Sequence, residues 1–259
     1  MKKKIITLVL SALVATGLVG CGSSSNSSNS GEATLKVGMV TDSGTIDDKS
    51  FNQGTWEGII EAEEKFGIEK NYLKPSGETE ADYLTEIQNL YDAGYKFIVA
   101  PGFKLDTAIY NAQEKYEDAK FILIDGEPND GNGNCVVADN TVAIQFAEQE
   151  GGFVAGVAAA LELQTGEFGF IGGMEAAAVK RFNYGFQQGV AYANEKLGTS
   201  ISLKAENIVY SGSFTDLALG QQIAAQMYDR GVKVIFAAAG ATGMGAITEA
   251  KTRAVNGQE

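Results

Sequence analysis

The stretch Leu35-Lys-Val-Gly-Met-Val-Thr-Asp-Ser-Gly-Thr-Ile-Asp-Asp-Lys-Ser-Phe-Asn-Gln-Gly-Thr-Trp56 carries three successive patterns. Residues 35–40 are strand-like, residues 41–50 are mostly polar, and residues 51–66 repeat apolar side chains at helical spacing. The polar loop therefore follows the carboxyl end of a strand. Ligands bind at this edge of open α/β sheets, because the loops diverge there and helix N-termini point free N–H groups into the crevice. The stretch thus predicts a βα unit whose loop holds a polar ligand.

Short strand-like runs alternate with longer amphipathic runs from residue 34 onward. This alternation favours an α/β fold of βαβ units, with mainly parallel sheets flanked by helices. The predicted strands are 35–40, 70–73, 97–100, 121–125, 135–138, 167–171, 201–210 and 234–238. The predicted helices are 51–66, 79–93, 105–116, 142–163, 177–197, 216–230 and 244–254. Thr79 and Asp82 have the spacing of a capping box, and Asp216 is a candidate N-cap.

The length of the chain favours two lobes of similar build, 34–139 and 140–259, over one sheet of eight strands. The apolar run 149–161 resembles a membrane span, but only 11 residues separate Glu150 from Glu162, so it predicts a buried core helix. Five predicted strands precede Asn140 and three follow it, so we expect the second lobe to be incomplete. The crevice between the lobes is the predicted ligand site.

The N-terminus has the pattern of an exported lipoprotein. Three lysines and an apolar run predict a signal peptide over residues 1–20. Leu18-Val-Gly-Cys21 looks like a lipobox, which predicts lipidation of Cys21, and the alternative is an ordinary signal that happens to contain this cysteine. Residues 21–33 are rich in Ser, Asn and Gly and predict a flexible tether. We therefore expect a lipid-anchored protein on the extracytoplasmic face of the cell membrane.

The composition excludes several classes of function. Removing residues 1–20 takes away three of the 20 basic residues and none of the 33 acidic ones, which leaves a net charge of −16 and argues against a nucleic-acid partner. The chain contains no histidine, so His-based catalysis and imidazole metal sites are excluded. Cys135, in an apolar run, predicts a small core residue rather than a nucleophile. We expect a binding protein rather than an enzyme.

The polar loop supplies the first group of candidate ligand-binding residues. A carboxylate such as Asp42 or Asp48 accepts hydrogen bonds through two oxygens, which suits the paired hydroxyls of a sugar. Asn52 can donate and accept, and Phe51 can present its ring to a flat ligand. The alternatives are helix capping for Ser50 and Asn52 and solvated loop charge for Asp48. The carboxylates lack the alternating spacing of a calcium loop, so we expect neither a metal ion nor a cofactor.

Three further candidates lie after other predicted strands. Asp125 ends a strand-like run, although a loop-capping role before Gly126 is equally compatible with its position. Phe182 is the counterpart of Phe51 in the second lobe, unless it forms an ordinary buried helix face with Phe186. Gly240 lacks a Cβ atom and so permits close approach of the backbone to a ligand.

Four motifs occur in a distinctive order along the chain. They are the run 42–52, Phe170-Ile-Gly-Gly173, Arg181-Phe-Asn-Tyr-Gly-Phe186 and Ala237-Ala-Ala-Gly-Ala-Thr-Gly-Met-Gly245. Together they resemble the basic membrane lipoprotein family, which contains purine-nucleoside-binding proteins of ABC importers. The resemblance implies a two-lobed, periplasmic-binding-protein-like (type I) fold. It also implies ribose or base contacts from Asp42, a base contact from Asp125 and stacking of the base on Phe182.

The function that the resemblance implies is capture of a nucleoside and its delivery to a membrane permease driven by an ATPase. The alternatives are an extracellular sensing module and a nucleoside- or sugar-cleaving enzyme that uses a carboxylate as general base. Members of the family continue with further strands, so we expect a truncated product that binds nucleosides weakly or not at all. Submicromolar binding of inosine or guanosine by residues 31–259 would contradict that expectation.

Overall fold

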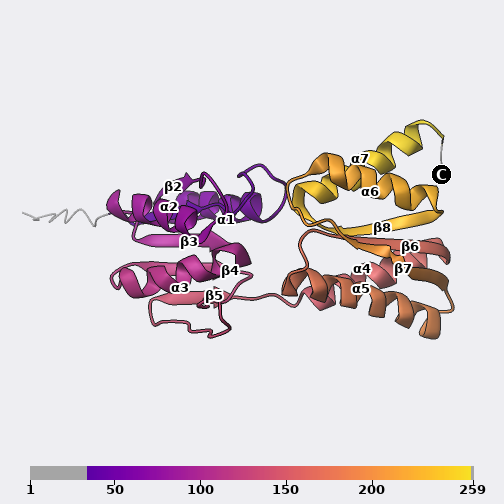
Figure 1. Ribbon diagram of the computed structural model, residues 1–259, viewed down its shortest axis with the longest axis horizontal. Helices are drawn as coiled ribbons and strands as arrows, with labels where there is room; N and C mark the ends of the chain where they lie inside the picture. Colours follow the sequence, from indigo (N-terminus) through magenta and orange to yellow (C-terminus); the bar gives the residue numbers. More distant parts are fainter. Residues whose placement is uncertain (1–33, 258–259) are drawn as a thin grey trace, which may run out of the picture. The chain divides into compact units, whose positions relative to one another are not determined.

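Two parallel β-sheets, each flanked by helices on both faces, make up the described part of the chain (Figure 1). The computed structural model describes residues 34–257. The predicted signal peptide over 1–20, Cys21 and the predicted tether over 21–33 lie outside the described residues. We call the part of the molecule around each sheet a lobe.

The first sheet has five parallel strands in the order β2-β1-β3-β4-β5. Their bounds are β1 (Lys36–Val40), β2 (Glu69–Leu73), β3 (Phe97–Pro101), β4 (Lys120–Ile124) and β5 (Thr141–Ile144). The helix α1 (Phe51–Phe66) packs on one face, while α2 (Glu80–Asp92) and α3 (Asp106–Lys115) pack on the other. A short 3₁₀ helix, η1 (Phe103–Leu105), follows β3. Because side chains alternate along each strand, this sheet contributes to two separate apolar clusters.

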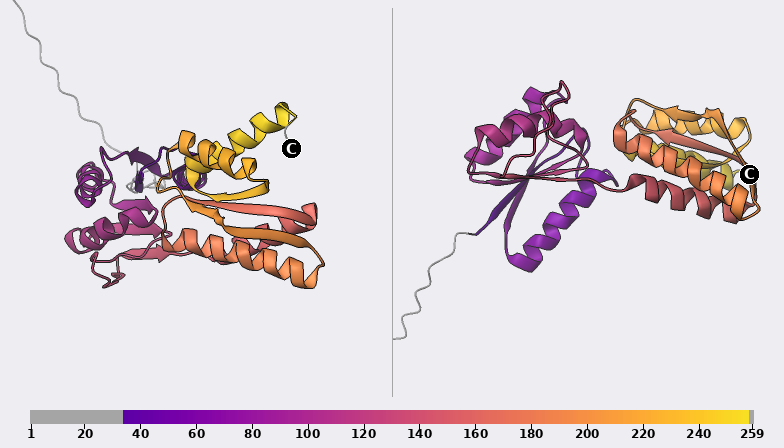
Figure 2. Two further views of the ribbon diagram at one scale, coloured as in Figure 1. Left: turned by 45° about the vertical axis from the view of Figure 1, so that its right-hand side comes forward. Right: turned by 90° about the horizontal axis from the view of Figure 1, so that it is seen from below.

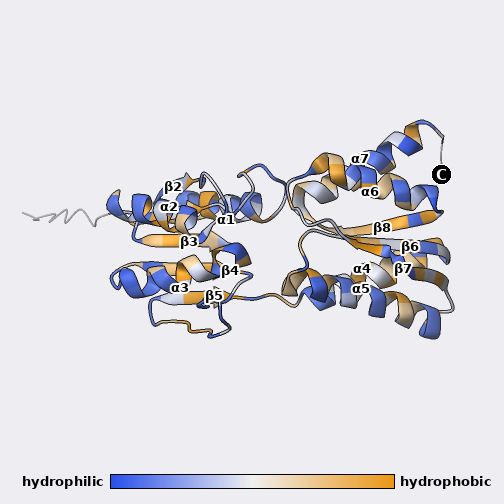
Figure 3. Cartoon of the chain, viewed as in Figure 1, coloured by the Kyte–Doolittle hydropathy of each residue, from blue (hydrophilic) through white to orange (hydrophobic). Residues whose placement is uncertain are grey.

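The second sheet has three parallel strands in the order β7-β6-β8 (Figure 2). They are β6 (Thr165–Gly172), β7 (Ser200–Tyr210) and β8 (Val232–Ala238). The helices α4 (Glu148–Leu163) and α5 (Ala177–Lys196) cover one face, and α6 (Leu217–Asp229) and α7 (Gly240–Val255) cover the other. Figure 3 shows β3 and β8 mainly in hydrophobic colours, while the helices carry both kinds of residue, as expected for strands buried on both faces.

The helices α4 and α5 approach unusually closely. A Cβ atom at Gly152 would lie 2.2 Å from the carbonyl oxygen of Phe182, and one at Gly156 would lie 2.5 Å from that of Phe186. Gly185 and Gly189 on α5 face the backbone of α4 equally closely. Glycines therefore set the distance between these helices and, with it, the position of the start of α5.

Most of the predicted elements are confirmed. The helix α1 has the predicted bounds, and the α/β class with parallel sheets holds throughout the described residues. Thr79 and Asp82 form the predicted capping box, and Asp216 caps α6 by accepting a hydrogen bond from the backbone N–H of Leu219 at 2.9 Å. Phe186 is 1% exposed and belongs to the core of the second lobe.

Three predictions around residue 140 are wrong. Residues 135–138 form no strand but an exposed loop, in which the side chain of Gln113 bonds the backbone of Val136 and Ala138. Cys135 in that loop is exposed rather than part of the core. Residues 142–144, predicted as the start of the helix 142–163, belong instead to β5 (Thr141–Ile144) of the first sheet.

The position of β5 also moves the division between the lobes. The predicted boundary between residues 139 and 140 falls before β5, although this strand pairs with β4. The first lobe therefore continues to Ile144, and α4, which begins at Glu148, is the first element of the second lobe.

Among the helices of residues 34–257, none has both the length and the apolar character that crossing a membrane requires.

Candidate functional site

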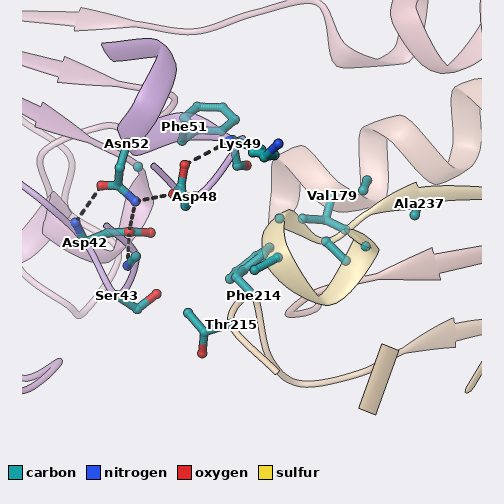
Figure 4. Close-up of a pocket in the computed structure, with 18 of the residues that line it drawn as sticks. Asp42, Ser43, Asp48, Lys49, Phe51, Asn52, Val179, Phe214, Thr215 and Ala237 are labelled. Carbon is teal, nitrogen blue, oxygen red and sulfur yellow. Dashed lines mark hydrogen bonds between the residues drawn. The ribbon is translucent and has the colours of Figure 1, made fainter. Parts of the chain in front are cut away.

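A cavity of about 370 Å³ lies at the carboxyl ends of the strands and is lined by both lobes (Figure 4). This volume is within the range typical of small-molecule sites, about 300–1,000 Å³. The cavity brings together all eight residues predicted to bind a ligand, which are Asp42, Asp48, Ser50, Phe51, Asn52, Asp125, Phe182 and Gly240.

A buried amide organises the polar wall of the cavity. Asn52 is 1% exposed, and its Nδ2 donates to Asp42 Oδ1 at 2.6 Å and to Asp48 Oδ2 at 2.7 Å. Its Oδ1 accepts a hydrogen bond from the backbone N–H of Asp42 at 3.1 Å. Figure 4 shows Asn52 between the two carboxylates. One side chain therefore fixes both acidic groups of the loop, and we call Asp42, Asp48 and Asn52 the carboxylate cluster.

The cluster changes the roles expected of its members. Both amide protons of Asn52 bond carboxylates, so this side chain orients Asp42 and Asp48 and has no proton left for a ligand. Asp48 Oδ1 accepts from the backbone N–H groups of Ser50 at 2.8 Å and Gln53 at 3.1 Å, so Asp48 satisfies the start of α1. Ser50 makes no side-chain cap hydrogen bond.

Asp42 keeps one carboxylate oxygen without a hydrogen-bond donor from the described residues. Its Oδ1 receives bonds from Asn52 and from the backbone N–H of Gly44 at 2.9 Å. Its Oδ2 accepts no hydrogen bond from any residue between 34 and 257. A Cβ atom at Gly44 would lie 2.4 Å from Asn52 Nδ2, so the glycine leaves room for the amide that holds the cluster.

The opposite wall of the cavity is apolar and comes mainly from the second lobe. Phe182 lies in the first turns of α5 and packs edge-on against Phe236 of β8, with ring centroids 6.1 Å apart. Val179, Ala237 and Met244 also line this side. Phe182 thus has contacts with the core on one side and lines the cavity on the other, so both sequence interpretations describe part of its surroundings.

Phe214 is an aromatic residue of the site that the sequence analysis missed. It lies in the loop after β7 and lines the cavity. A Cβ atom at Gly173 would lie 2.2 Å from its ring, so the second glycine of the Phe170–Gly173 motif makes room for it. In the first lobe, the ring of Phe103 lies 6.2 Å away and Lys104 Nζ lies 5.9 Å from the Phe214 centroid. The available signal was an aromatic residue in another loop that follows a strand.

Gly240 begins α7 where the cavity meets the end of β8. Its φ of 55° lies in the left-handed region, and a Cβ atom there would lie 2.9 Å from the carbonyl oxygen of Phe214. Only glycine adopts this conformation without strain. N–H groups in the first turn of a helix lack intrahelical acceptors. In α7 the N–H of Thr242 donates to the carbonyl oxygen of Phe214 at 3.3 Å, which leaves the N–H groups of Gly240 and Ala241 as donors at the cavity wall.

Asp125 lies next to two charged residues of the second lobe. It follows β4 with a φ of 57°, a strained conformation for a residue other than glycine. Burial and a hydrogen bond with Glu148 raise the pKa of Asp125 above that of an ordinary aspartate. Burial alone would raise the pKa of Glu148 too, but hydrogen bonds from Arg181 and Asp125 outweigh it and lower that pKa. Arg181 Nε donates to Glu148 Oε2 at 2.5 Å.

Comparison with protein families gives a match over nearly all the described residues. The model of a family described as ABC transporter substrate-binding protein, PnrA-like, matches residues 35–257. It therefore covers the carboxylate cluster, the aromatic residues of the cavity and both sheets.

Two curated relatives and one solved structure illustrate the similarity. A CD4+ T-cell-stimulating antigen of Listeria innocua is 38% identical, and an ABC transporter nucleoside-binding protein, BmpA, of Lactococcus lactis is 34% identical. Each alignment covers 97% of this chain and 69% of the relative. The crystal structure of an ABC transporter solute-binding protein of Aeropyrum pernix K1 has a TM-score of 0.76 and 27% identity, and the match covers 86% of this chain and 60% of that protein. The predicted two-lobed binding-protein fold is confirmed by this match.

Proposed function

The chain belongs to the family of PnrA-like ABC transporter substrate-binding proteins, and from this premise we propose that it captures a nucleoside, with a purine base, for import. The observation that supports this ligand is the pairing of a carboxylate cluster with aromatic rings across one cavity. A nucleoside has the matching parts, namely a sugar with paired hydroxyls and a flat base. The name of the Lactococcus relative, a nucleoside-binding protein, agrees with this assignment.

In the proposed complex, the sugar lies at the polar wall and the base lies among the rings. Asp42 Oδ2, which has no donor within residues 34–257, accepts from a ribose hydroxyl. Phe51, Phe182 and Phe214 present ring surface to the base, and stacking of a base on such a ring contributes about 1–3 kcal/mol. Asp42 and Asp48 repel a phosphate group, so nucleosides bind better than nucleotides.

Membership of the family supports a proposal about the partners. We propose that the ligand-bound protein delivers its nucleoside to a permease that an ATPase drives, and that it does no covalent chemistry itself. Ligand stabilises the arrangement of lobes that it binds most tightly, which gives the permease a surface to distinguish loaded from empty protein.

A titration of the purified protein tests the ligand. We expect guanosine and inosine to bind, and their monophosphates to bind at least about 10-fold more weakly because of repulsion by the carboxylate cluster. The titration extends to millimolar ligand, so that binding is detected over a wide range of affinities. Chromatography of the recovered ligand distinguishes a binder, which returns the nucleoside intact, from a hydrolase, which returns free base.

Variants of the aromatic wall test the geometry. Phe182→Ala is expected to weaken guanosine binding by about 5-fold to 100-fold through loss of stacking. The control is Phe66→Ala, which truncates a ring that is 71% exposed at the end of α1 and does not line the cavity. Equal losses in the two variants, or none in Phe182→Ala, would contradict the proposed site.

We also propose that lipid on Cys21 anchors the protein to the extracytoplasmic face of the membrane. The support is the lipobox-like Leu18-Val-Gly-Cys21 and the polar run that follows it. Cys21→Ser is expected to move the protein from the membrane fraction to the soluble fraction of the cells or the medium. Retention of this variant in the membrane fraction would show that another feature provides the attachment.

A further inference from the structure

Two carboxyl groups from different lobes, the partly buried Asp125 and the buried Glu148, approach within hydrogen-bond reach beside the cavity. Asp125 follows β4 in the first lobe, and Glu148 opens α4 in the second. Glu148 is 3% exposed. As carboxylate oxygens, its Oε1 and the Oδ1 of Asp125 are both buried, and neither accepts a hydrogen bond from a donor within the described residues. A buried carboxylate oxygen without a donor is costly, so this pair requires an explanation.

One proton placed between the two groups would satisfy both oxygens. Arg181 Nε donates to the other oxygen of Glu148 at 2.5 Å, so the guanidinium compensates the charge of one carboxylate. A second negative charge in the same buried place would have no partner. Because Glu148 already has its cation, the proton belongs on Asp125, whose hydroxyl then donates to Glu148.

We propose that Glu148 and Arg181 are positioning residues that hold Asp125 as a neutral, hydrogen-bonded acid at the wall of the cavity, building on the nucleoside-binding function proposed above. In this form Asp125 turns one oxygen toward Glu148 and leaves the other as an acceptor for an N–H or O–H group of the ligand. The same hydrogen bond connects the end of β4 to the start of α4, and so joins the two lobes beside the ligand.

The charged groups around Asp125 determine how its hydrogen bond with Glu148 responds to pH. The charged groups that face it within residues 34–257 are Glu148 on α4, Arg181 on α5 and Asp106 at the start of α3. Burial raises the pKa of Asp106 to about 7, so Asp106 itself is mostly protonated below neutral pH and adds a second negative charge near Asp125 only at higher pH. Folding raises the pKa of Asp125 to about 7. The hydrogen bond between Asp125 and Glu148 is therefore fully present at acidic pH and is lost as the pH rises through about 7. Two facing carboxylates then repel each other.

The decisive measurement is a titration of the Asp125 side chain by carbon NMR in the ligand-free protein. Its carboxyl signal is identified by its absence in Asp125→Asn. At about pH 5.5 an ordinary aspartate, with a pKa of about 3.9, is ionised, whereas we expect Asp125 to be protonated. An ionised Asp125 at this pH in the unaltered protein would overturn the inference without any need for a variant.

Two matched variants test whether Glu148 is the residue that keeps Asp125 protonated. Glu148→Gln keeps the shape of the side chain and supplies an amide N–H to Asp125, so Asp125 is expected to be ionised at about pH 5.5. The control Glu150→Gln removes the same charge from an exposed position in the same turn and is expected to leave Asp125 protonated. If Glu148→Gln fails to fold, Arg181→Gln serves instead: Glu148 then has no cation and competes for the shared proton, so Asp125 is expected to be only partly protonated at about pH 5.5. An unchanged titration in the folded variant would overturn the role of that residue.

Binding measured at two pH values tests the consequence for the ligand. Guanosine affinity is expected to fall at least about 3-fold between about pH 5.5 and pH 8 in the unaltered protein, and to stay constant in Glu148→Gln. A constant affinity in the unaltered protein would overturn the link between this pair and the ligand. If guanosine binds at neither pH, the proposed function fails, and the carbon titration still decides whether Glu148 and Arg181 hold the proton on Asp125.

Discussion

The two walls of the cavity are held in place by different means. In the first lobe, hydrogen bonds from the buried amide of Asn52 fix the carboxylate cluster. In the second lobe, rings and aliphatic side chains form the wall, and glycines beneath them fix their positions, as Gly173 does for Phe214. The polar wall therefore depends on the match between donors and acceptors, while the apolar wall depends on available volume.

This difference predicts how each wall fails. A change of charge with no change of size should damage the first wall, since its partly buried carboxylates need their hydrogen-bond donor. A single added methyl group should damage the second wall, since closely packed backbones cannot accommodate it. A change of charge should have little effect where no carboxylate depends on a donor, and an added methyl group should have little effect where there is space for it.

The largest effect is expected from Asn52→Asp, which replaces a donor amide by a third carboxylate of the same size. The free energy of unfolding should fall by about 3 kcal/mol at neutral pH, because hydrogen bonds to two charged groups are lost and like charges meet. Crowding by like charge raises the pKa of the new carboxyl in the folded state. The loss should therefore be small below about pH 4 and grow as the pH rises, which urea unfolding at several pH values would measure.

Asn52→Ala is the control for charge. It removes the same donors and adds no carboxylate, so its loss of stability should vary less with pH than that of Asn52→Asp. Equal losses of stability for the two variants at every pH would show that the carboxylates do not interact. The first wall would then depend on packing rather than on charge.

A smaller loss is expected when volume is added between α4 and α5. Gly152→Ala places a Cβ atom 2.2 Å from the carbonyl oxygen of Phe182, so the helices must separate, at a cost of about 2 kcal/mol. Gly58→Ala is the matched control, because this glycine lies within α1 with no atom within 4 Å of its added Cβ. It should raise stability by about 0.5–1 kcal/mol. Urea unfolding in which Gly152→Ala matches Gly58→Ala would contradict the close packing of the two helices.

The smallest of these effects concerns Phe214. Phe214→Ala should weaken guanosine binding about 5-fold, or about 1 kcal/mol, because the ring is one of several that face the proposed base. Gly173→Ala should also weaken guanosine binding, because its added Cβ atom would displace the ring of Phe214. Calorimetric titration of both variants checks this expectation. A loss in Gly173→Ala without one in Phe214→Ala would mean that the glycine supports some other part of the wall.

Patterns among neighbouring residues predicted most of the fold. The predictions failed where contacts between residues distant in the sequence decide the structure. The bounds of α1 and the cap at Thr79 depend on residues within one or two turns, so the sequence reveals them. Residues 135–138 have strand-like composition, but Gln113, distant in sequence, bonds their backbone instead of a strand. The short run Thr141–Ile144 precedes a helix directly, and only its pairing with β4 makes it a strand.

The candidate site shows the same division. Its eight predicted residues were found because each lies at or beside the end of a strand or the start of a helix, which sequence patterns locate. The bonds of Asn52 to both carboxylates were not foreseen, because they depend on how the loop folds back on itself. The approach of Glu148 to Asp125 was missed because it brings two lobes together.

The exposed position of Cys135 has a practical consequence. It is the single cysteine within residues 34–257 and lies in a surface loop of the first lobe. Desolvation and nearby carboxylates, among them Glu127, raise the pKa of its thiol, so maleimide coupling is expected to be slow at neutral pH and faster in mildly alkaline buffer. In protein that starts after Cys21, a fluorophore would therefore attach at this one site and label the lobe that carries Asp42 without any substitution.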